Sequence, residues 1–239
     1  MNMIKKLVVK IIHSLGYDVY KIPKVDFAGL DKLGIKTILD IGANRGQFAK
    51  RAFIAFPKTK IFCFEPVKPA FEELDKWAQL EGQKRVFAFN IALGDKKDIK
   101  EMFLHSDHDD SSSMLQTTKS YEKDFSFVKN QQEITVEQYP LDIAVEKFVK
   151  KNFKKEILVK MDVQGYENLV IEGAKKILSE AKACIIEIVN DKFYEGQPDF
   201  KKIFSRMNSL EFKYYGNLEQ VNDYKDGHII YYDAIFLKI

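Results

Sequence analysis

The sequence contains little cysteine, no long apolar run and no marked excess of charge of either sign. Its two cysteines, Cys63 and Cys184, both lie in apolar runs, which excludes a disulfide-stabilised secreted scaffold and suits a reducing compartment. No stretch of about eighteen apolar residues is present, which argues against an integral membrane helix. The 38 basic residues are balanced by 35 acidic ones and form no dense stripe, which disfavours a nucleic-acid partner. These absences predict a cytoplasmic protein.

The N-terminal segment MNMIKKLVVKIIHSLGY has apolar residues at helical spacing, interrupted by lysines and His13. This pattern predicts an amphipathic helix, in an extension over residues 1–30, rather than a secretory signal. Packing of its apolar face onto the domain is the favoured interpretation. A weak peripheral contact of residues 1–15 with an anionic membrane surface is the alternative.

The rest of the chain alternates short apolar runs with helical patterns. This order is typical of a parallel sheet covered by helices on both faces, and 239 residues are enough for one domain over residues 1–239. The predicted strands cover 36–41, 60–65, 85–93, 156–163 and 183–189, and the predicted helices cover 46–56, 68–80, 166–181 and 198–210.

Two segments depart from this alternation. Residues 99–141 contain two strand-like runs around a polar loop, which predicts an inserted strand-loop-strand excursion. The C-terminal segment FKYYGNL to HIIYYDAIFLKI has two strand patterns and a turn-rich link without a helix. The last strand is therefore expected to be antiparallel to its neighbour.

The stretch TILDIGANRGQF joins the first predicted strand to its helix. Its glycines, Gly42 and Gly46, are spaced neither for a dinucleotide nor for a triphosphate. Asp40 ends the strand before them, and Glu65 ends the second strand, where its oxygens can accept bonds from a ribose diol. Each piece alone could be a turn or a strand end. Together they describe a ligand with a cationic amino acid end and an unphosphorylated ribose, as in S-adenosylmethionine.

Six segments in this order carry a resemblance to a known family. They are LDIGANRGQF, FEPVKPAFEEL, NIALGD, SSSML, YPLD and VKMDVQGYENLVIEGAKKIL. The chain resembles the FkbM-like family of S-adenosylmethionine-dependent methyltransferases over nearly everything after residue 35. The resemblance implies a Rossmann-like class I methyltransferase fold: α/β, with a mostly parallel twisted sheet of about seven strands, the last antiparallel, and helices on both faces. It also implies O-methylation of a hydroxyl on a saccharide, glycolipid or other small-molecule acceptor.

The expected cofactor-binding residues follow from the strand ends and the resemblance together. Asn90, Ile91 and Ala92 are expected near the adenine, although Asn90 could also be an ordinary strand-end turn residue. The expected set is Asp40, Gly42, Ala43, Asn44, Gly46, Phe48, Glu65, Pro66, Asn90, Ile91, Ala92 and Asp162.

Asp162 is the candidate catalytic base, because it follows an apolar strand and should emerge beside the transferred methyl group. A helix N-cap is its alternative role. Lys160 is expected to steer Asp162 or to pair with Glu187, or else to reach solvent. Many family members have glutamate where this chain has Gln164, so no base is expected there. The serine run 111–113 could border the acceptor pocket or form a solvated loop.

A divalent cation is an open question in the sequence. Asp162, Asn190 and Asp191 would supply hard oxygen ligands at one edge of the sheet if magnesium is used. The segment HSDHDD, residues 105–110, could also hold a cation or form a solvated polar face.

Two other functions share this fold pattern. A nicotinamide-dependent oxidoreductase would use the acid at Glu65, but the dinucleotide glycine pattern is missing. A non-catalytic binding or scaffold protein could keep the fold without the chemistry. The identity of the acceptor and the oligomeric state are not predicted.

Overall fold

The computed structural model describes residues 9, 12–16, 27–105, 111–125 and 128–238. Most of the predicted N-terminal extension lies outside these residues, so its helix and its membrane contact stay predictions. In the described part of the chain, no helix combines the length and apolar character that crossing a membrane requires.

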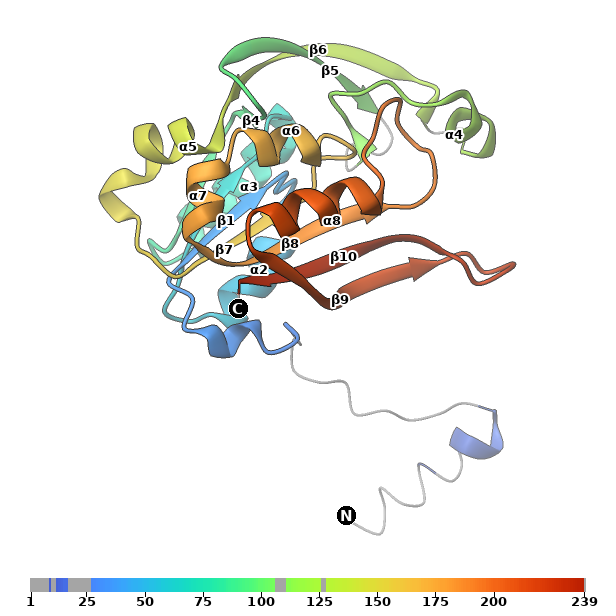
Figure 1. Ribbon diagram of the computed structural model, residues 1–239, viewed down its shortest axis with the longest axis horizontal. Coiled ribbons are helices and arrows are strands. Elements are labelled where there is room, and N and C mark those ends of the chain that lie inside the picture. Colours follow the sequence, from blue (N-terminus) through green and yellow to red (C-terminus); the bar gives the residue numbers. More distant parts are fainter. Residues whose placement is uncertain (1–8, 10–11, 17–26, 106–110, 126–127, 239) are drawn as a thin grey trace.

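A seven-stranded sheet forms the centre of the protein, with the strand order β3-β2-β1-β7-β8-β10-β9 (Figure 1). The strands from β3 to β8 are parallel, and β10 is antiparallel to both of its neighbours. The predicted α/β fold with an antiparallel last strand is therefore confirmed. The strands are β1 (Thr37–Ile41), β2 (Lys60–Phe64), β3 (Val86–Phe89), β7 (Ile157–Met161), β8 (Ala181–Val189), β9 (Phe212–Asn222) and β10 (Ile229–Lys238).

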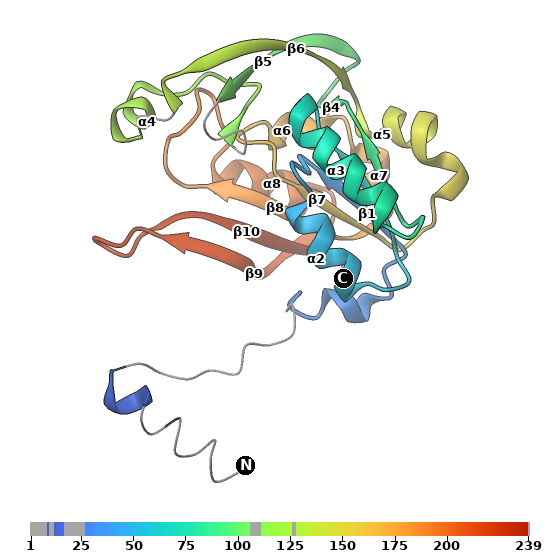
Figure 2. The ribbon, with the colours of Figure 1, turned by 180° about the vertical axis from the view of Figure 1, so that it is seen from behind.

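Helices cover both faces of this sheet. Helices α6, α7 and α8 lie in front of it in Figure 1, and the view from behind in Figure 2 shows α2 and α3 on the other face. Pro69 stands in the first turn of α3, and Asp199 caps α8 by accepting a bond of 2.8 Å from the Lys202 amide. The helices are α2 (Gln47–Ala55), α3 (Lys68–Leu80), α6 (Glu167–Glu172), α7 (Lys175–Glu180) and α8 (Phe200–Ser209).

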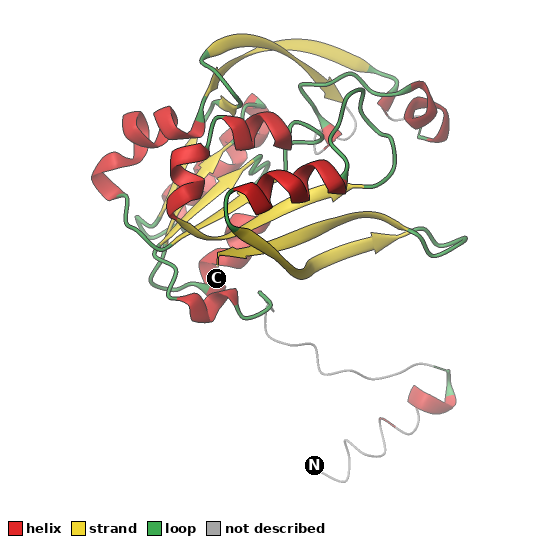
Figure 3. Ribbon diagram, viewed as in Figure 1, coloured by secondary structure: helices red, strands yellow, loops and turns green. Residues whose placement is uncertain are grey.

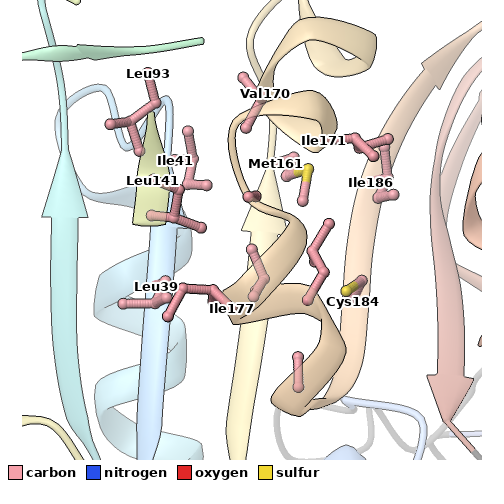
Figure 4. Close-up of a cluster of buried hydrophobic side chains, with 14 of the residues drawn as sticks. Leu39, Ile41, Leu93, Leu141, Met161, Val170, Ile171, Ile177, Cys184 and Ile186 are labelled. Atoms are coloured by element: carbon pink, nitrogen blue, oxygen red, sulfur yellow. The ribbon is translucent and has the colours of Figure 1, made fainter. Parts of the chain in front are cut away.

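The strands are apolar on both sides because both sides are covered. Figure 4 shows one side, where Leu39, Met161 and Ile186 meet α6 and α7. The alternate residues, such as Ile38 and Leu158, face α2 and α3. Each fully buried side chain of this size contributes about 1.5–3 kcal/mol, so the centre of the sheet is a rigid support for the residues at its carboxyl edge.

A second, three-stranded sheet in the order β4-β6-β5 stands beside the main one (Figure 3). The two strands predicted in the excursion over 99–141 correspond to β5 and β6. The prediction of one strand over 85–93 was wrong, because this run forms β3 in the main sheet and β4 in the small one. Asn90 interrupts that run, because its side-chain amide donates to the carbonyls of Glu65 and Pro66, both at 2.9 Å. The chain then enters the small sheet. Its strands are β4 (Ala92–Leu93), β5 (Asp98–His105) and β6 (Gln131–Tyr139), with α4 (Lys119–Asp124) between β5 and β6.

The predicted single helix over 166–181 is two helices, broken at Gly173. A Cβ atom on Gly173 would lie 1.9 Å from the Gly94 carbonyl oxygen, so the close approach of the two backbones requires glycine. Asp142 caps the second helix, since its carboxylate accepts from the amides of Lys176 and Ile177. Four further helical turns were not predicted. One lies before β1, η1 (Leu30–Leu33). The other three lie between β6 and β7: α5 (Leu141–Ala144), η4 (Val145–Val149) and η5 (Lys150–Asn152).

Candidate active site

A cavity of about 610 Å³ opens at the carboxyl edge of the main sheet. It lies where the strand order reverses, because the chain runs from β1 outward to β3 on one side and from β7 outward to β10 on the other. Open α/β sheets bind ligands at this switch point. The loops after β1 and β2 line one half of the cavity, and residues from β7, β8 and β10 line the other.

The loop after β1 is held firmly against its neighbours. Gly42 and Ala43 donate to the Phe64 carbonyl at 3.0 and 3.1 Å. Gly42 has φ of 75°, and a Cβ there would lie 1.8 Å from the Asp162 carbonyl oxygen. Only glycine fits this position, and its backbone brings the loop and the end of β7 together.

Glu65 is buried behind the same loop. Its two carboxylate oxygens accept from the amides of Asn44 and Val67, each at 2.7 Å. The side chain predicted to bind a ribose therefore also shapes the loop around it.

The other expected cofactor residues divide into two groups. Ile91 and Ala92 line the cavity, but Asn90 and Gly46 are not among the lining residues. Asn90 holds the end of β2 as described above, and Gly46 precedes the first turn of α2. The remaining expected residues all line the cavity: Asp40, Gly42, Ala43, Asn44, Phe48, Glu65, Pro66 and Asp162.

A row of charged side chains crosses four adjacent strands on the face beneath α2. Asp40 on β1 is in register with Lys160 on β7, and Glu187 on β8 is in register with Asp233 on β10. The Lys160 ammonium lies 2.9 Å from Asp162 Oδ2 and 3.5 Å from Asp233 Oδ1, and only 3% of the lysine is exposed. One cation thus serves a group of carboxylates.

Burial and mutual repulsion shift the pKa values of this row. Burial raises the pKa of Asp40 to about 7, against the opposing pull of Lys160, and one carboxylate oxygen of Asp40 has no hydrogen-bond partner in the described structure. Burial and the neighbouring Asp162 raise the pKa of Glu187. Burial alone would raise the pKa of Asp162, but the bond to Lys160 outweighs it and the pKa is lowered. Of the two neighbouring acids Asp162 and Glu187, Asp162 is therefore the ionised one.

Gln164 connects the two carboxylates to the serine run. Its side-chain amide donates to Asp162 Oδ1 at 2.9 Å and to Glu187 Oε2 at 2.8 Å. The hydroxyl of the buried Tyr194 lies 2.9 Å from Gln164 Oε1 and 2.7 Å from the Ser111 carbonyl oxygen. Ser113 donates to the Gln164 carbonyl at 2.6 Å. Gln164 is thus a positioning residue for the acids and not a base.

The serine run is buried, and Ser111 and Ser112 line the cavity. His105 anchors it, because its Nδ1 lies 2.9 Å from the Ser111 carbonyl oxygen. Burial lowers the pKa of His105, so the ring is neutral at physiological pH. The rest of the HSDHDD segment, residues 106–110, lies outside the described residues, and its cation-binding alternative stays a prediction.

The residues of the magnesium alternative have other partners. The Asn190 side chain donates to the Ile229 carbonyl at 2.8 Å, and Asp191 lies 3.1 Å from Nε2 of His228. Neither residue lines the cavity with Asp162. Among the described residues, the acids and histidines spaced for a cation are at the tip of the β9–β10 hairpin: Asp223, Asp226 and His228.

Comparison with known proteins places the chain in a family. The model of the FkbM methyltransferase domain matches residues 40–214, which run from the end of β1 to the start of β9 and include most of the residues that line the cavity. The chain belongs to the FkbM methyltransferase family. The predicted resemblance is therefore confirmed, and the protein has the fold of class I S-adenosylmethionine-dependent methyltransferases.

Two relatives illustrate how close the similarity is. The 2-O-methyltransferase NoeI of Sinorhizobium fredii is 29% identical over 180 residues, which are 73% of this chain and 72% of that protein. The crystal structure of the FkbM methyltransferase from Methylobacillus flagellatus has a TM-score of 0.52 and 12% identity, and the match covers 85% of this chain. It covers only 43% of the solved chain, so this FkbM protein spans less than half of that relative and shares the fold of the matched part.

Some residues of this FkbM cavity were missed by the sequence analysis. Asp233, Arg51 and Glu219 line it, as do three aromatic residues, Tyr121, Phe125 and Phe193. Asp233 had a usable signal, since a lone acid within the apolar strand run IIYYDAIFLK is unexpected in a buried strand. The aromatic residues had none, because their proximity depends on the path of the loops.

Asp40→Asn is expected to make the protein more stable above about pH 6 while weakening cofactor binding. The folded carboxyl has a pKa of about 7 and the ordinary value is 3.8, so the folded state keeps a proton that the unfolded chain releases. Stability therefore falls as the pH rises through this window, and asparagine removes that loss. The gain is expected to be about 1–3 kcal/mol near pH 7.5 and close to zero near pH 4. Thermal unfolding of both proteins across this range measures it, and a difference that does not grow with pH contradicts the assignment.

Proposed function

We propose that this protein transfers a methyl group from S-adenosylmethionine to a hydroxyl of a small-molecule acceptor, most simply a saccharide or glycolipid. The observation that carries the proposal is the single cavity that joins the loop after β1, with Asp40 and Glu65, to the ionised Asp162 and the serine run. Methyl transfer is proposed because the chain belongs to the FkbM methyltransferase family. The relative named 2-O-methyltransferase supports oxygen as the accepting atom.

The residues of the first half fit the proposed cofactor. The unpartnered oxygen of buried Asp40 is an acceptor for an ammonium group, and Glu65 places a carboxylate, the group that accepts bonds from a diol, in the lining after β2. The apolar side chains of Ile91 and Phe64 suit a flat base. Carboxylates outnumber cations in the lining, which favours a ligand with a sulfonium and an ammonium group. When bound, S-adenosylmethionine supplies an electrophilic methyl group.

Asp162 is positioned to receive the proton of the acceptor hydroxyl. The Lys160 bond keeps this carboxylate ionised, and Gln164 fixes its other oxygen, so its orientation is set before the acceptor binds. A carboxylate with a lowered pKa is a weak base, so it takes the proton as the new oxygen–carbon bond forms rather than beforehand. Lys160 holds Asp162 and has no direct part in the proton transfer.

Calorimetric titration with S-adenosylhomocysteine and, separately, with NADH tests the proposal. We expect S-adenosylhomocysteine to bind with a Kd below about 100 μM and NADH not to bind. Enzymes typically have KM values near the physiological levels of their ligands, which sets this scale. Gly42→Ala is the matched negative variant, since its Cβ displaces the loop from Asp162. Binding of NADH instead, or of neither ligand, contradicts the proposed function. Turnover measured with and without magnesium tests the metal alternative.

A further inference from the structure

The half of the cavity away from the cofactor loop has an aromatic wall. Tyr121 and Phe193 stack with ring centres 4.1 Å apart, and Phe125 packs edge-on against both. Tyr121 and Phe125 come from α4 and its end, whereas Phe193 comes from the link after β8. The two segments are joined by the Thr118 amide, which donates to the Phe193 carbonyl at 2.8 Å. Figures 1 and 2 both show α4 beside this link.

The aromatic wall packs against buried residues of the site and is not an isolated surface patch. Tyr121 also meets Tyr194 edge-on, and Tyr194 directs its hydroxyl at the Ser111 carbonyl and at Gln164. The aromatic cluster, the serine run and the catalytic carboxylates are therefore one connected structure. An acceptor that lies against the aromatic wall shares the cavity with Ser111 and Ser112, which supply hydroxyl groups.

The charges of the cavity are strongly unequal. Six carboxylates line it, and the cations that line it are Arg51 and Lys160, counted over the described residues. Both cations are matched: Arg51 forms an ion pair with Glu219, and Lys160 pairs with Asp162 and Asp233. Burial raises the pKa values of Asp40 and Glu187, so these two acids carry only part of a negative charge near pH 7, whereas Asp162 is ionised. An anionic group next to the methylated hydroxyl would meet the Asp162 carboxylate, and the described lining offers it no uncommitted cation.

We propose that the aromatic half of the cavity is the subsite for the non-reacting part of an uncharged saccharide acceptor, and that the carboxylates exclude acceptors with a carboxylate, phosphate or sulfate close to the methylated hydroxyl. This inference rests on the proposed function. Aromatic rings bind the apolar C–H face of a sugar, and carboxylate and serine oxygens accept its hydroxyl protons. Rejection of the anion is the repulsive part of the specificity, since like charges brought together in a partly desolvated site cost several kcal/mol.

Saturation-transfer NMR with the full chain and S-adenosylhomocysteine tests the charge selection. The probes are the methyl glycosides of glucose, galactose and mannose, each with its matched uronate. At least one neutral member is expected to bind, with an affinity at least about tenfold above that of its uronate. A uronate that binds as well as its neutral partner overturns the proposal. So does a panel in which no neutral member binds.

Phe125→Ala and Phe193→Ala test the aromatic wall. Each is expected to lower the affinity of the neutral glycoside about fivefold, in line with the value of an aromatic contact. Tyr224→Ala is the matched control, because this ring is 89% exposed on the hairpin and does not line the cavity. Equal affinities in all three variants would overturn the assignment of the wall. Affinity for S-adenosylhomocysteine, measured in the same samples, should be unchanged.

Glu219→Gln tests whether affinity for a uronate can be gained. The substitution releases Arg51 from its ion pair, so the cavity acquires an uncommitted cation. The uronate is expected to gain at least about threefold in affinity while the neutral glycoside changes little. No gain for the uronate contradicts the charge argument. If the unaltered protein does not bind S-adenosylhomocysteine, the proposed function itself is contradicted. Failure of the charge argument and failure of the proposed function are therefore distinguishable.

Discussion

Asp162→Asn should reduce kcat by about 10²–10⁴-fold while leaving the affinity for S-adenosylhomocysteine within a few-fold of the unaltered protein. Asparagine keeps the shape and can still accept from the Lys160 ammonium, but it cannot take a proton from the acceptor. The cofactor half is built mainly from the loops after β1 and β2, which the substitution leaves in place. The rate at which S-adenosylhomocysteine and the methylated glycoside form together, at saturating S-adenosylmethionine, measures kcat.

Asp191→Asn is the matched control for this substitution. Asp191 follows β8 at the same edge of the sheet, but it pairs with His228 and does not line the cavity. It is expected to keep full activity. If Asp191→Asn is as inactive as Asp162→Asn and activity requires magnesium, the two residues act together as metal ligands and the proton-transfer role is wrong. If Asp162→Asn retains most of its turnover, the base must be another residue, with Glu187 the nearest candidate.

The parts of the fold that depend on local pattern were predicted from the sequence. Residues 36–41 and 60–65 are apolar, β-branched and short, and they form β1 and β2 nearly as predicted. The helix over 68–80 begins and ends as predicted, because Pro69 and the apolar spacing both mark it. The breaks at Asn90 and Gly173 were not predicted. Each depends on contacts with a distant segment, a carbonyl pair at the end of β2 and the backbone at Gly94.

The same distinction applies to the candidate site. Asp40 and Lys160 were identifiable because each lies in a recognisable motif near the end of a buried strand. Asp233 joins them only through the antiparallel register of β10 with β8, and register cannot be read from one strand. Phe193 is far in the sequence from Tyr121 and Phe125, and it meets them through loops. Asp162 was singled out from its place after a buried strand, and its role as base stays a prediction. The surroundings that lower its pKa and orient it depend on contacts between distant segments.

Lys160→Met should destabilise the folded protein by about 3–5 kcal/mol near pH 7.5, among the largest losses expected of a single substitution in this chain. Methionine fills a similar volume, so the loss is due to charge: Asp162 and Asp233 lose the buried cation that they share, and Asp40 and Glu187 lie in the same row. Removing the cation raises the pKa of each acid further. Protonation then relieves the repulsion, so the loss should shrink to about 1 kcal/mol near pH 5.

Urea unfolding of the two proteins at the two pH values measures this effect, with Lys36→Met as the matched control. Lys36 also pairs with a glutamate, Glu156 at 3.2 Å, but its side chain is 54% exposed, so its loss should cost no more than about 1 kcal/mol at either pH. The double variant Lys160→Met with Asp233→Asn should recover part of the stability, because it removes one of the uncompensated carboxylates. If Lys160→Met costs no more than Lys36→Met, or costs the same at both pH values, the charged row does not depend on Lys160. The same lysine would then hold Asp162 for catalysis without being needed for the fold.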